Sequence, residues 1–182
     1  MVNIYKLQLT NLQQEILRLL FIKAGKKLNQ NQLAKALKVS PPGITKALPY
    51  LEKKELIALN QDRESKRWEI SLNTNNQDAI WLKRADNLKQ IYESGLAKFL
   101  QDNLQAATII LFGSYSTGED TFNSDIDIAA IGIKPRQLNL ENFERLLERK
   151  ININYYGTFK SIDRHLLNNI LNGIVLKGSI EI

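Results

Sequence analysis

Two acidic residues at the start of a predicted strand give the strongest chemical signal in the sequence. In Asp125-Ile126-Asp127-Ile128, the period of a strand puts Asp125 and Asp127 on one face and the isoleucines on the other. Neighbouring like charges repel, so this arrangement favours a divalent cation bound between them. Ligand sets made only of oxygen suit Mg²⁺, which commonly takes one or two carboxylates plus substrate phosphates. We expect Asp125 and Asp127 to be metal ligands, for Mg²⁺ or Mn²⁺.

A glycine and a serine precede this acid pair in the chain. Gly113 and Ser114 directly follow an apolar run, residues 106–112, that predicts a buried strand. Glycine allows a close approach of the backbone to a ligand, and the amide groups there can donate to a phosphate. We therefore expect Gly113 and Ser114 to bind a phosphate group. Glu119 and Asp120, which lie between the two motifs, are expected to be solvated loop residues.

Together these residues form a pattern of Gly-Ser, ten residues, then Asp-x-Asp. The pattern, in a strand–loop–strand context, resembles the nucleotidyltransferases of the DNA polymerase beta superfamily, particularly their minimal, antitoxin-like members. The resemblance covers about residues 85–180. It implies transfer of a nucleoside monophosphate from an NTP, which we expect to be ATP, to a hydroxyl acceptor. By the same resemblance, Asp125 and Asp127 would hold the metal ions and be the catalytic residues, and Gly113 and Ser114 would hold the nucleotide triphosphate.

The same resemblance implies a third carboxylate on the following strand, residues 150–156. The matching position here is Asn152, with Asn154 next on the same face. An amide oxygen can bind Mg²⁺, but it brings one negative charge fewer, and losing one preorganised charge commonly costs on the order of 10²–10³ in rate. Glu148 is an alternative third acid, although its position on a helix favours the surface. The sequence thus predicts an intact nucleotide site with weakened catalysis.

Basic charge is concentrated in the first part of the chain. Residues 1–74 hold 13 Lys and Arg against 6 Asp and Glu, a net charge of +7, whereas residues 75–182 have a net charge of −1. Thr10-x-x-Gln13 and Ser40-Pro41 are helix-start signals. Over about residues 8–73 the sequence predicts three helices, then an apolar strand at residues 56–59 and a return strand at residues 67–72 whose polar and apolar residues alternate. This order of elements resembles the winged helix-turn-helix family.

That resemblance implies DNA binding by the third helix, in the major groove, and by the hairpin wing on phosphates. Pro49 interrupts this helix, and residues 41–53 include no Arg, Asn or Gln to read a base edge. We therefore expect affinity for DNA without sharp sequence specificity. The expected DNA contacts are Ser40, Pro42, Thr45, Lys46 and Tyr50 on the helix and Arg63, Lys66 and Arg67 on the wing.

We expect an α+β protein with a winged helix over residues 1–74, a connecting helix over 75–104 and a nucleotidyltransferase-like α/β domain with a mixed sheet over 105–182. The connecting helix is predicted to run from about residue 77 to 101, weakened at Gly95. It would pack on the second domain or pair with another chain, which leaves a homodimer open.

Three functions remain open at this stage: a Mg²⁺-dependent enzyme, a DNA-binding regulator whose transferase domain senses nucleotide, and an antitoxin-like protein that binds a partner protein. The absence of cysteine excludes disulfides and zinc-thiolate sites. The longest nearly apolar run, residues 106–113, is too short to span a bilayer. Residues 1–10 lack an apolar signal core, so we expect a cytoplasmic protein with no membrane partner.

Overall fold

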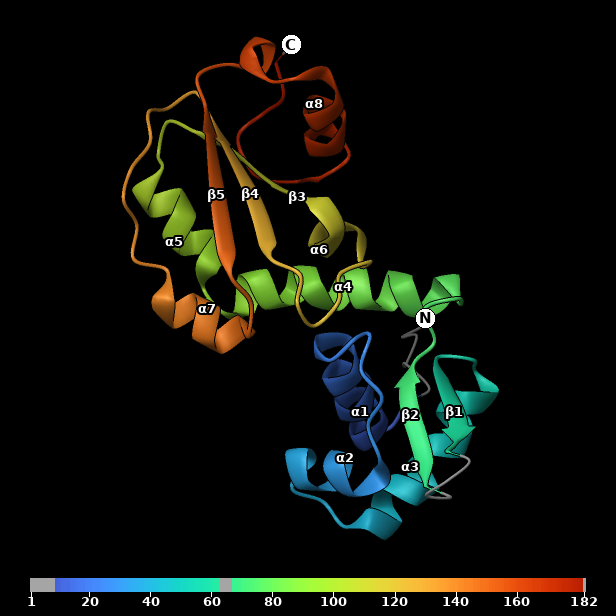
Figure 1. Ribbon diagram of the computed structural model, residues 1–182. Helices are drawn as coiled ribbons and strands as arrows, with labels where there is room; N and C mark the ends of the chain where they lie inside the picture. Colours follow the sequence, from blue (N-terminus) through green and yellow to red (C-terminus); the bar gives the residue numbers. More distant parts are fainter. Residues whose placement is uncertain (1–8, 63–66, 182) are drawn as a thin grey trace, which may run out of the picture. The chain divides into compact units, whose positions relative to one another are not determined.

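The computed structural model describes residues 9–62 and 67–181 (Figure 1). The chain divides into two units, Met1–Ala79 and Ile80–Ile182, and the division falls inside the helix α4 (Gln77–Glu93). Each unit has its own core and is described by itself.

The first unit consists of helices followed by a hairpin. Its elements are α1 (Asn11–Ile22), α2 (Gln30–Leu37), α3 (Pro41–Lys53), β1 (Ile57–Gln61) and β2 (Trp68–Leu72).

Side-chain caps start each of these helices. Thr10 and Gln13 form the predicted capping box of α1, and Asn29 forms a second box with Gln32 at α2. Ser40 accepts from the backbone N–H of Gly43, and α3 starts with a proline, which lacks the N–H that would be unsatisfied there. The strands β1 and β2 pair antiparallel. This is the winged-helix arrangement that the sequence resemblance implied.

The second unit is built around a mixed sheet. Its other elements are α5 (Leu96–Asn103), β3 (Thr108–Phe112), α6 (Gly113–Thr117), β4 (Ile126–Ile131), α7 (Glu141–Leu147), β5 (Ile151–Tyr156), the 3₁₀ turn Phe159–Ser161, α8 (Arg164–Leu171) and β6 (Ile174–Lys177). The strand order is β5-β4-β3-β6, with β4 and β5 parallel and the other pairs antiparallel. The predicted mixed sheet is therefore confirmed.

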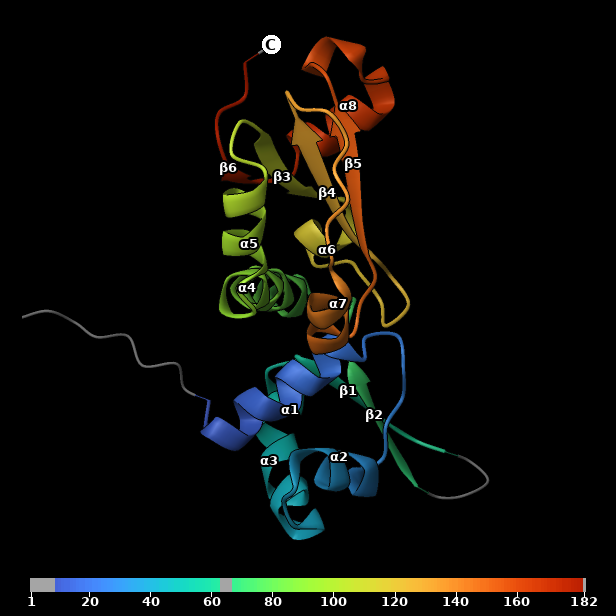
Figure 2. The same cartoon turned by 90° about the vertical axis from the view of Figure 1, so that its left-hand side faces the viewer.

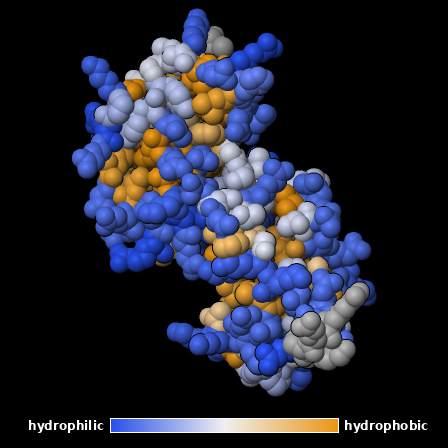
Figure 3. Space-filling view, in the orientation of Figure 1, coloured by the Kyte–Doolittle hydropathy of each residue, from blue (hydrophilic) through white to orange (hydrophobic). Residues whose placement is uncertain are grey.

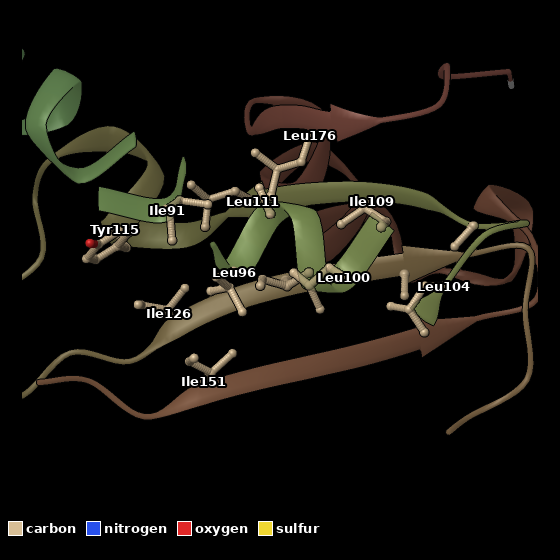
Figure 4. Packing of buried hydrophobic residues seen from close by; sticks show 14 of the residues in the cluster. Ile91, Leu96, Leu100, Leu104, Ile109, Leu111, Tyr115, Ile126, Ile151 and Leu176 are labelled. Carbon is tan, nitrogen blue, oxygen red and sulfur yellow. The ribbon is translucent and has the colours of Figure 1, made fainter. Parts of the chain in front are cut away.

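Helices cover both faces of this sheet (Figure 2). On one face, Leu96, Leu100 and Leu104 of the α5 region pack against alternate strand residues such as Ile109 and Ile126 (Figure 4). On the other face, the intervening strand residues pack against α8 and the 3₁₀ turn. The alternation buries both sides of β3 and β4, so the polar residues at their ends are held in fixed positions.

Two local expectations are wrong. The single helix predicted over residues 77–101 is two helices, because Gly95 adopts a left-handed conformation with φ +79° that ends α4 before α5 begins. The segment after β3, expected to be a loop between two strands, begins with the short helix α6, which ends at Thr117 and is capped by Gly118.

The face of the molecule seen in Figure 3 is mostly polar, with apolar residues emerging in patches. Among residues 9–62 and 67–181, no helix combines the length and apolar character needed to cross a membrane.

Candidate nucleotide and metal site

The antiparallel pairing of β3 with β4 places the glycine beside the acid pair. Phe112, the last residue of β3, lies opposite Asp127, so Gly113 passes directly next to that side chain. Gly113 has φ +73°, and a β-carbon added to it would lie 2.9 Å from Asp127 Oδ2. Only glycine fits this conformation and this space without strain. Ser114 follows in α6 and is half-buried.

The parallel pairing of β4 with β5 brings Asn152 to the same place. Asp127 lies opposite Asn152 in the register. Asn152 Nδ2 donates to Asp125 Oδ2 at 3.1 Å and to Asp127 Oδ1 at 3.4 Å. The amide group thus bridges two carboxylates that would otherwise only repel each other, and its N–H groups supply the positive end of a dipole between them.

Water reaches this group of residues. Asp125 and Asn152 are exposed and Asp127 is half-buried. Solvent screens the repulsion between the two carboxylates and lowers its cost to the fold.

The donor set fits a hard divalent cation. The carboxylates of Asp125 and Asp127 lie next to the side-chain amide of Asn152. Rotating this amide by half a turn puts its Oδ1 where Nδ2 lies, so that all three side chains offer the oxygen ligands that Mg²⁺ prefers. Within residues 9–62 and 67–181, no three His, Cys, Asp or Glu side chains gather in a group that could hold a metal ion. The two carboxylates give this set two negative charges, and a third acid would make it three. Glu148, the alternative third acid, is an exposed residue at the end of α7.

Asp120 is not the solvated loop residue that the sequence suggested. It is only 2% exposed and lies in a buried polar cluster, whereas Glu119 is exposed as expected. Its carboxylate forms an ion pair with Lys83 of α4 and a second one with Arg149, at 3.3 Å. It also accepts from Asn87 Nδ2 at 2.7 Å. A carboxylate this deeply buried is stable because it has several charged and polar partners.

Sequence reasoning missed Lys83, Asn87 and Arg149. Lys83 and Asn87 lie on the face of α4 that also carries Ile80 and Ile91, with helical spacing, and Ile91 is part of the core. A lysine and an asparagine on the core-facing side of a helix were therefore the signal in the sequence that could have indicated a buried polar cluster. Burial lowers the pKa of the Lys83 ammonium below its ordinary value, an effect that neighbouring Asp120 opposes.

In the first unit, the expected DNA contacts of α3 lie on its outward side. Ser40, Pro42, Thr45 and Lys46 are exposed, and Tyr50 is half-buried. The Thr45 hydroxyl donates to the carbonyl of Pro41 at 3.0 Å. Pro49 is accommodated inside the helix, which continues to Lys53.

The expected wing contacts are only partly within the described structure. Arg67, immediately before β2, is exposed. Arg63 and Lys66 lie outside the described residues.

The fold and the site together define a two-part class of protein, with a winged helix in one unit and a nucleotidyltransferase-like sheet with a Gly-Ser and Asp-x-Asp site in the other. Comparison with family models agrees. Residues 94–180 match the model "Polymerase beta, Nucleotidyltransferase", and residues 9–68 match the MarR family model. The chain joins a MarR-type winged helix to a polymerase-beta-like domain. A comparison with curated proteins gave no match.

Solved structures of MarR-type regulators are also similar to part of this chain. The S. aureus MepR–DNA complex is 30% identical with a TM-score of 0.38, and the match covers 52% of this chain and 81% of that one. A mutant MepR from a multidrug resistant S. aureus clinical isolate is 33% identical with a TM-score of 0.38, covering 43% and 55%. A single-residue mutant of Lactococcus lactis ZitR is 23% identical with a TM-score of 0.43, covering 56% and 66%.

Proposed function

We propose that the second unit binds an NTP together with Mg²⁺ or Mn²⁺ and transfers a nucleoside monophosphate to a hydroxyl acceptor. The observation that carries this proposal is the convergence of Gly113, Asp125, Asp127 and Asn152 at the ends of β3, β4 and β5. ATP is our candidate for the NTP.

Each residue has a defined part in this proposal. The backbone of Gly113 and Ser114 faces the phosphates, because glycine lets the chain pass directly beside Asp127. Asp125 and Asp127 hold the metal, with Asn152 as an additional oxygen ligand. When bound, the metal neutralises phosphate charge and favours the ionised form of the acceptor hydroxyl.

The amide at position 152 favours a second candidate function. Because Asn152 donates to both carboxylates and carries no charge, the site binds a cation less strongly than three acids would. A site that binds nucleotide and turns it over slowly suits a regulator. In this alternative the transferase-like unit senses nucleotide or holds a partner protein, as an antitoxin does.

For the first unit we propose DNA binding without sharp sequence specificity. Support comes from the MarR family match, from the net charge of +7 over residues 1–74 and from the exposed α3 residues Ser40, Pro42, Thr45 and Lys46. Dimer formation, common for symmetric DNA sites, is part of this proposal.

Incubation with α-labelled NTPs and Mg²⁺, with the protein itself and RNA ends as acceptors, tests the enzyme against the sensor. Labelled product that requires Mg²⁺ supports the enzyme. Saturable Mg-ATP binding without product supports the sensor and contradicts the transferase.

The double variant Asp125→Asn/Asp127→Asn is the matched test of the site. It is expected to abolish metal-dependent nucleotide binding while the fold is retained, since both residues border solvent. Asp163→Asn serves as the control, because Asp163 is an exposed helix cap that asparagine replaces well. Unchanged Mg²⁺ affinity in the double variant would contradict the site.

A further inference from the structure

The segment from Gly113 to Asp120, here called the 113–120 segment, is held by one face of α4. Lys83 Nζ donates to the carbonyl of Gly118 at 3.2 Å and to the carbonyl of Asp120 at 2.8 Å, besides its ion pair with the Asp120 carboxylate. Lys83 is fully buried, at 0% exposure. Its ammonium therefore has the three acceptors that its three protons need.

Neighbouring residues of the same helix face add contacts to this segment. Arg84 Nε donates to the carbonyl of Ser116 at 2.9 Å, and Asn87 Nδ2 donates to the carbonyl of Tyr115 at 2.9 Å. Most of these bonds end on backbone carbonyls, so they fix the path of the main chain. Figure 1 shows α6 beside α4.

Steric contact reinforces the hydrogen bonds. Gly118 has φ +83°, and a β-carbon there would lie 2.6 Å from the carbonyl oxygen of Ile80 and 3.0 Å from the amide of Arg84. The segment therefore lies directly on the backbone of α4, with no space for a side chain between them.

Asp120 also links this segment to the metal side of the site. Its second oxygen, Oδ2, pairs with Arg149, which lies two residues before β5 and three before Asn152. One buried carboxylate thus connects α4, the segment that carries Gly113 and Ser114, and the strand that carries Asn152.

We propose that Lys83 is a positioning residue that holds the 113–120 segment, through Gly118 and Asp120, in the conformation that receives the triphosphate. The proposal rests on the proposed nucleotide-binding function. Lys83 is too buried to touch the nucleotide, so it acts through the backbone it binds. The positions of Asp125 and Asp127 are set by the sheet instead, because Asp127 lies in β4 and Asp125 comes immediately before that strand.

Because Lys83 holds the 113–120 segment and the sheet holds the acid pair, we expect loss of Lys83 to weaken nucleotide binding and to leave metal binding unchanged. The test variant is Lys83→Met, which keeps the length of the side chain and leaves Asp120 with Arg149 and Asn87 as partners. With the full chain, we expect Mn-ATP affinity to fall about 10- to 100-fold, as for other residues that orient a ligand-binding group. The affinity for Mn²⁺ alone is expected to stay within about twofold, since the acid pair is not displaced.

Hydrogen exchange measured without ligand gives a readout independent of nucleotide. In Lys83→Met, the amides of the 113–120 segment are expected to exchange faster, while those of β3 and β4 keep their protection. Gly118→Ala, which pushes the same segment away from α4, should reproduce the effect. This second variant keeps the test decisive if the first does not fold.

Two controls separate positioning from general loss of stability. Lys89→Met removes an exposed lysine from the same helix and should change nothing. Ile170→Ala opens a cavity in the core on the opposite face of the sheet and lowers stability without touching the segment.

The outcomes are distinct. Unchanged exchange in the 113–120 segment, or an equal loss of Mn-ATP affinity in Ile170→Ala, would overturn the positioning role. If wild-type protein binds no nucleotide, the proposed function fails, while hydrogen exchange still decides whether Lys83 holds the segment. Parallel loss of Mn²⁺ and Mn-ATP affinity in Lys83→Met would also overturn the proposal.

Discussion

At the scale of single residues, we expect the charge at position 152 to decide how strongly the proposed site binds a cation. Asn152 donates its amide protons to both Asp125 and Asp127, so the site without metal is held by hydrogen bonds instead of by repelling charges. A third carboxylate would reverse this balance, weakening the metal-free protein and strengthening metal binding.

Asn152→Asp is therefore expected to melt at a lower temperature than wild type in EDTA and to gain more stability from added Mg²⁺. If the enzyme proposal holds, the transfer rate should rise by on the order of 10²–10³. Thermal unfolding with and without Mg²⁺ measures the first effect. Asn154→Asp, the same change two residues further along β5, is the control, and an equal Mg²⁺ response in both variants would contradict the role of position 152.

Gly113 offers a second prediction at this scale. Gly113→Ala places a β-carbon against Asp127 in a left-handed conformation, which by itself costs about 1–2 kcal/mol. We expect a lower free energy of unfolding in urea and weaker Mg-ATP binding. Gly95→Ala is the matched control, because Gly95 is also left-handed, with φ +79°, and a β-carbon there meets nothing within 4 Å. Equal losses in the two variants would argue against the close approach to Asp127.

At the scale of elements, the turn from α7 into β5 is fixed by an acid. Glu144 Oε1 accepts from the backbone N–H of Ile151 at 3.1 Å, and Glu144 also pairs with Lys150 at 3.2 Å. The bond to Ile151 is the main reason that the pKa of the Glu144 carboxyl lies below its ordinary value of 4.5. This contact sets where β5 starts, and β5 carries Asn152.

A lowered pKa in the folded state gives a defined dependence on pH. The stabilisation by ionised Glu144 is complete above the unfolded value of 4.5 and is lost as the pH falls through the lower folded value. Glu144→Gln should therefore be less stable than wild type at neutral pH and lose less stability on acidification, as measured by urea unfolding.

Glu141→Gln, an exposed change on the same helix, is the control for this effect. An acid dependence in Glu144→Gln that is as steep as in wild type would show that the ionisation of Glu144 adds no stability.

At the scale of the whole molecule, the two units differ in charge and in their proposed partners. The positive charge of residues 1–74 favours a polyanion, whereas residues 75–182 are nearly neutral, with a net charge of −1. DNA binding by the first unit should therefore weaken steeply as salt is added, because counterions are released from DNA phosphates.

Lys46→Ala is expected to weaken DNA binding and to reduce the slope of log affinity against log salt by about 1, the effect of one lost phosphate contact. Fluorescence anisotropy with a labelled duplex over a range of salt concentrations measures this slope. Lys98→Ala, an exposed lysine of α5, is the control. Binding that is insensitive to salt would contradict a DNA role and favour a protein partner for this unit.

Local patterns in the sequence determined much of the architecture. The caps at Thr10 and Ser40 and the apolar run before Gly113 depend on neighbours within a few residues, so they were predictable. The pairing of Gly113-Ser114 with Asp125-x-Asp127 was visible for the same reason, because a short connection joins adjacent strands. The break at Gly95 was underestimated, since a glycine inside a helical pattern can either weaken it or end it.

Tertiary structure alone decided the environment of the polar residues. The family resemblance had placed position 152 at this site, but only the register of β5 on β4 showed that the Asn152 amide donates to both acids. The packing of α4 buried Lys83 against Asp120, which local polarity assigns to solvent. Sequence pattern reports which residues can lie on one face of an element. The partners that make a buried charge or a bridged acid pair stable come from distant elements, and only the packed fold brings them together.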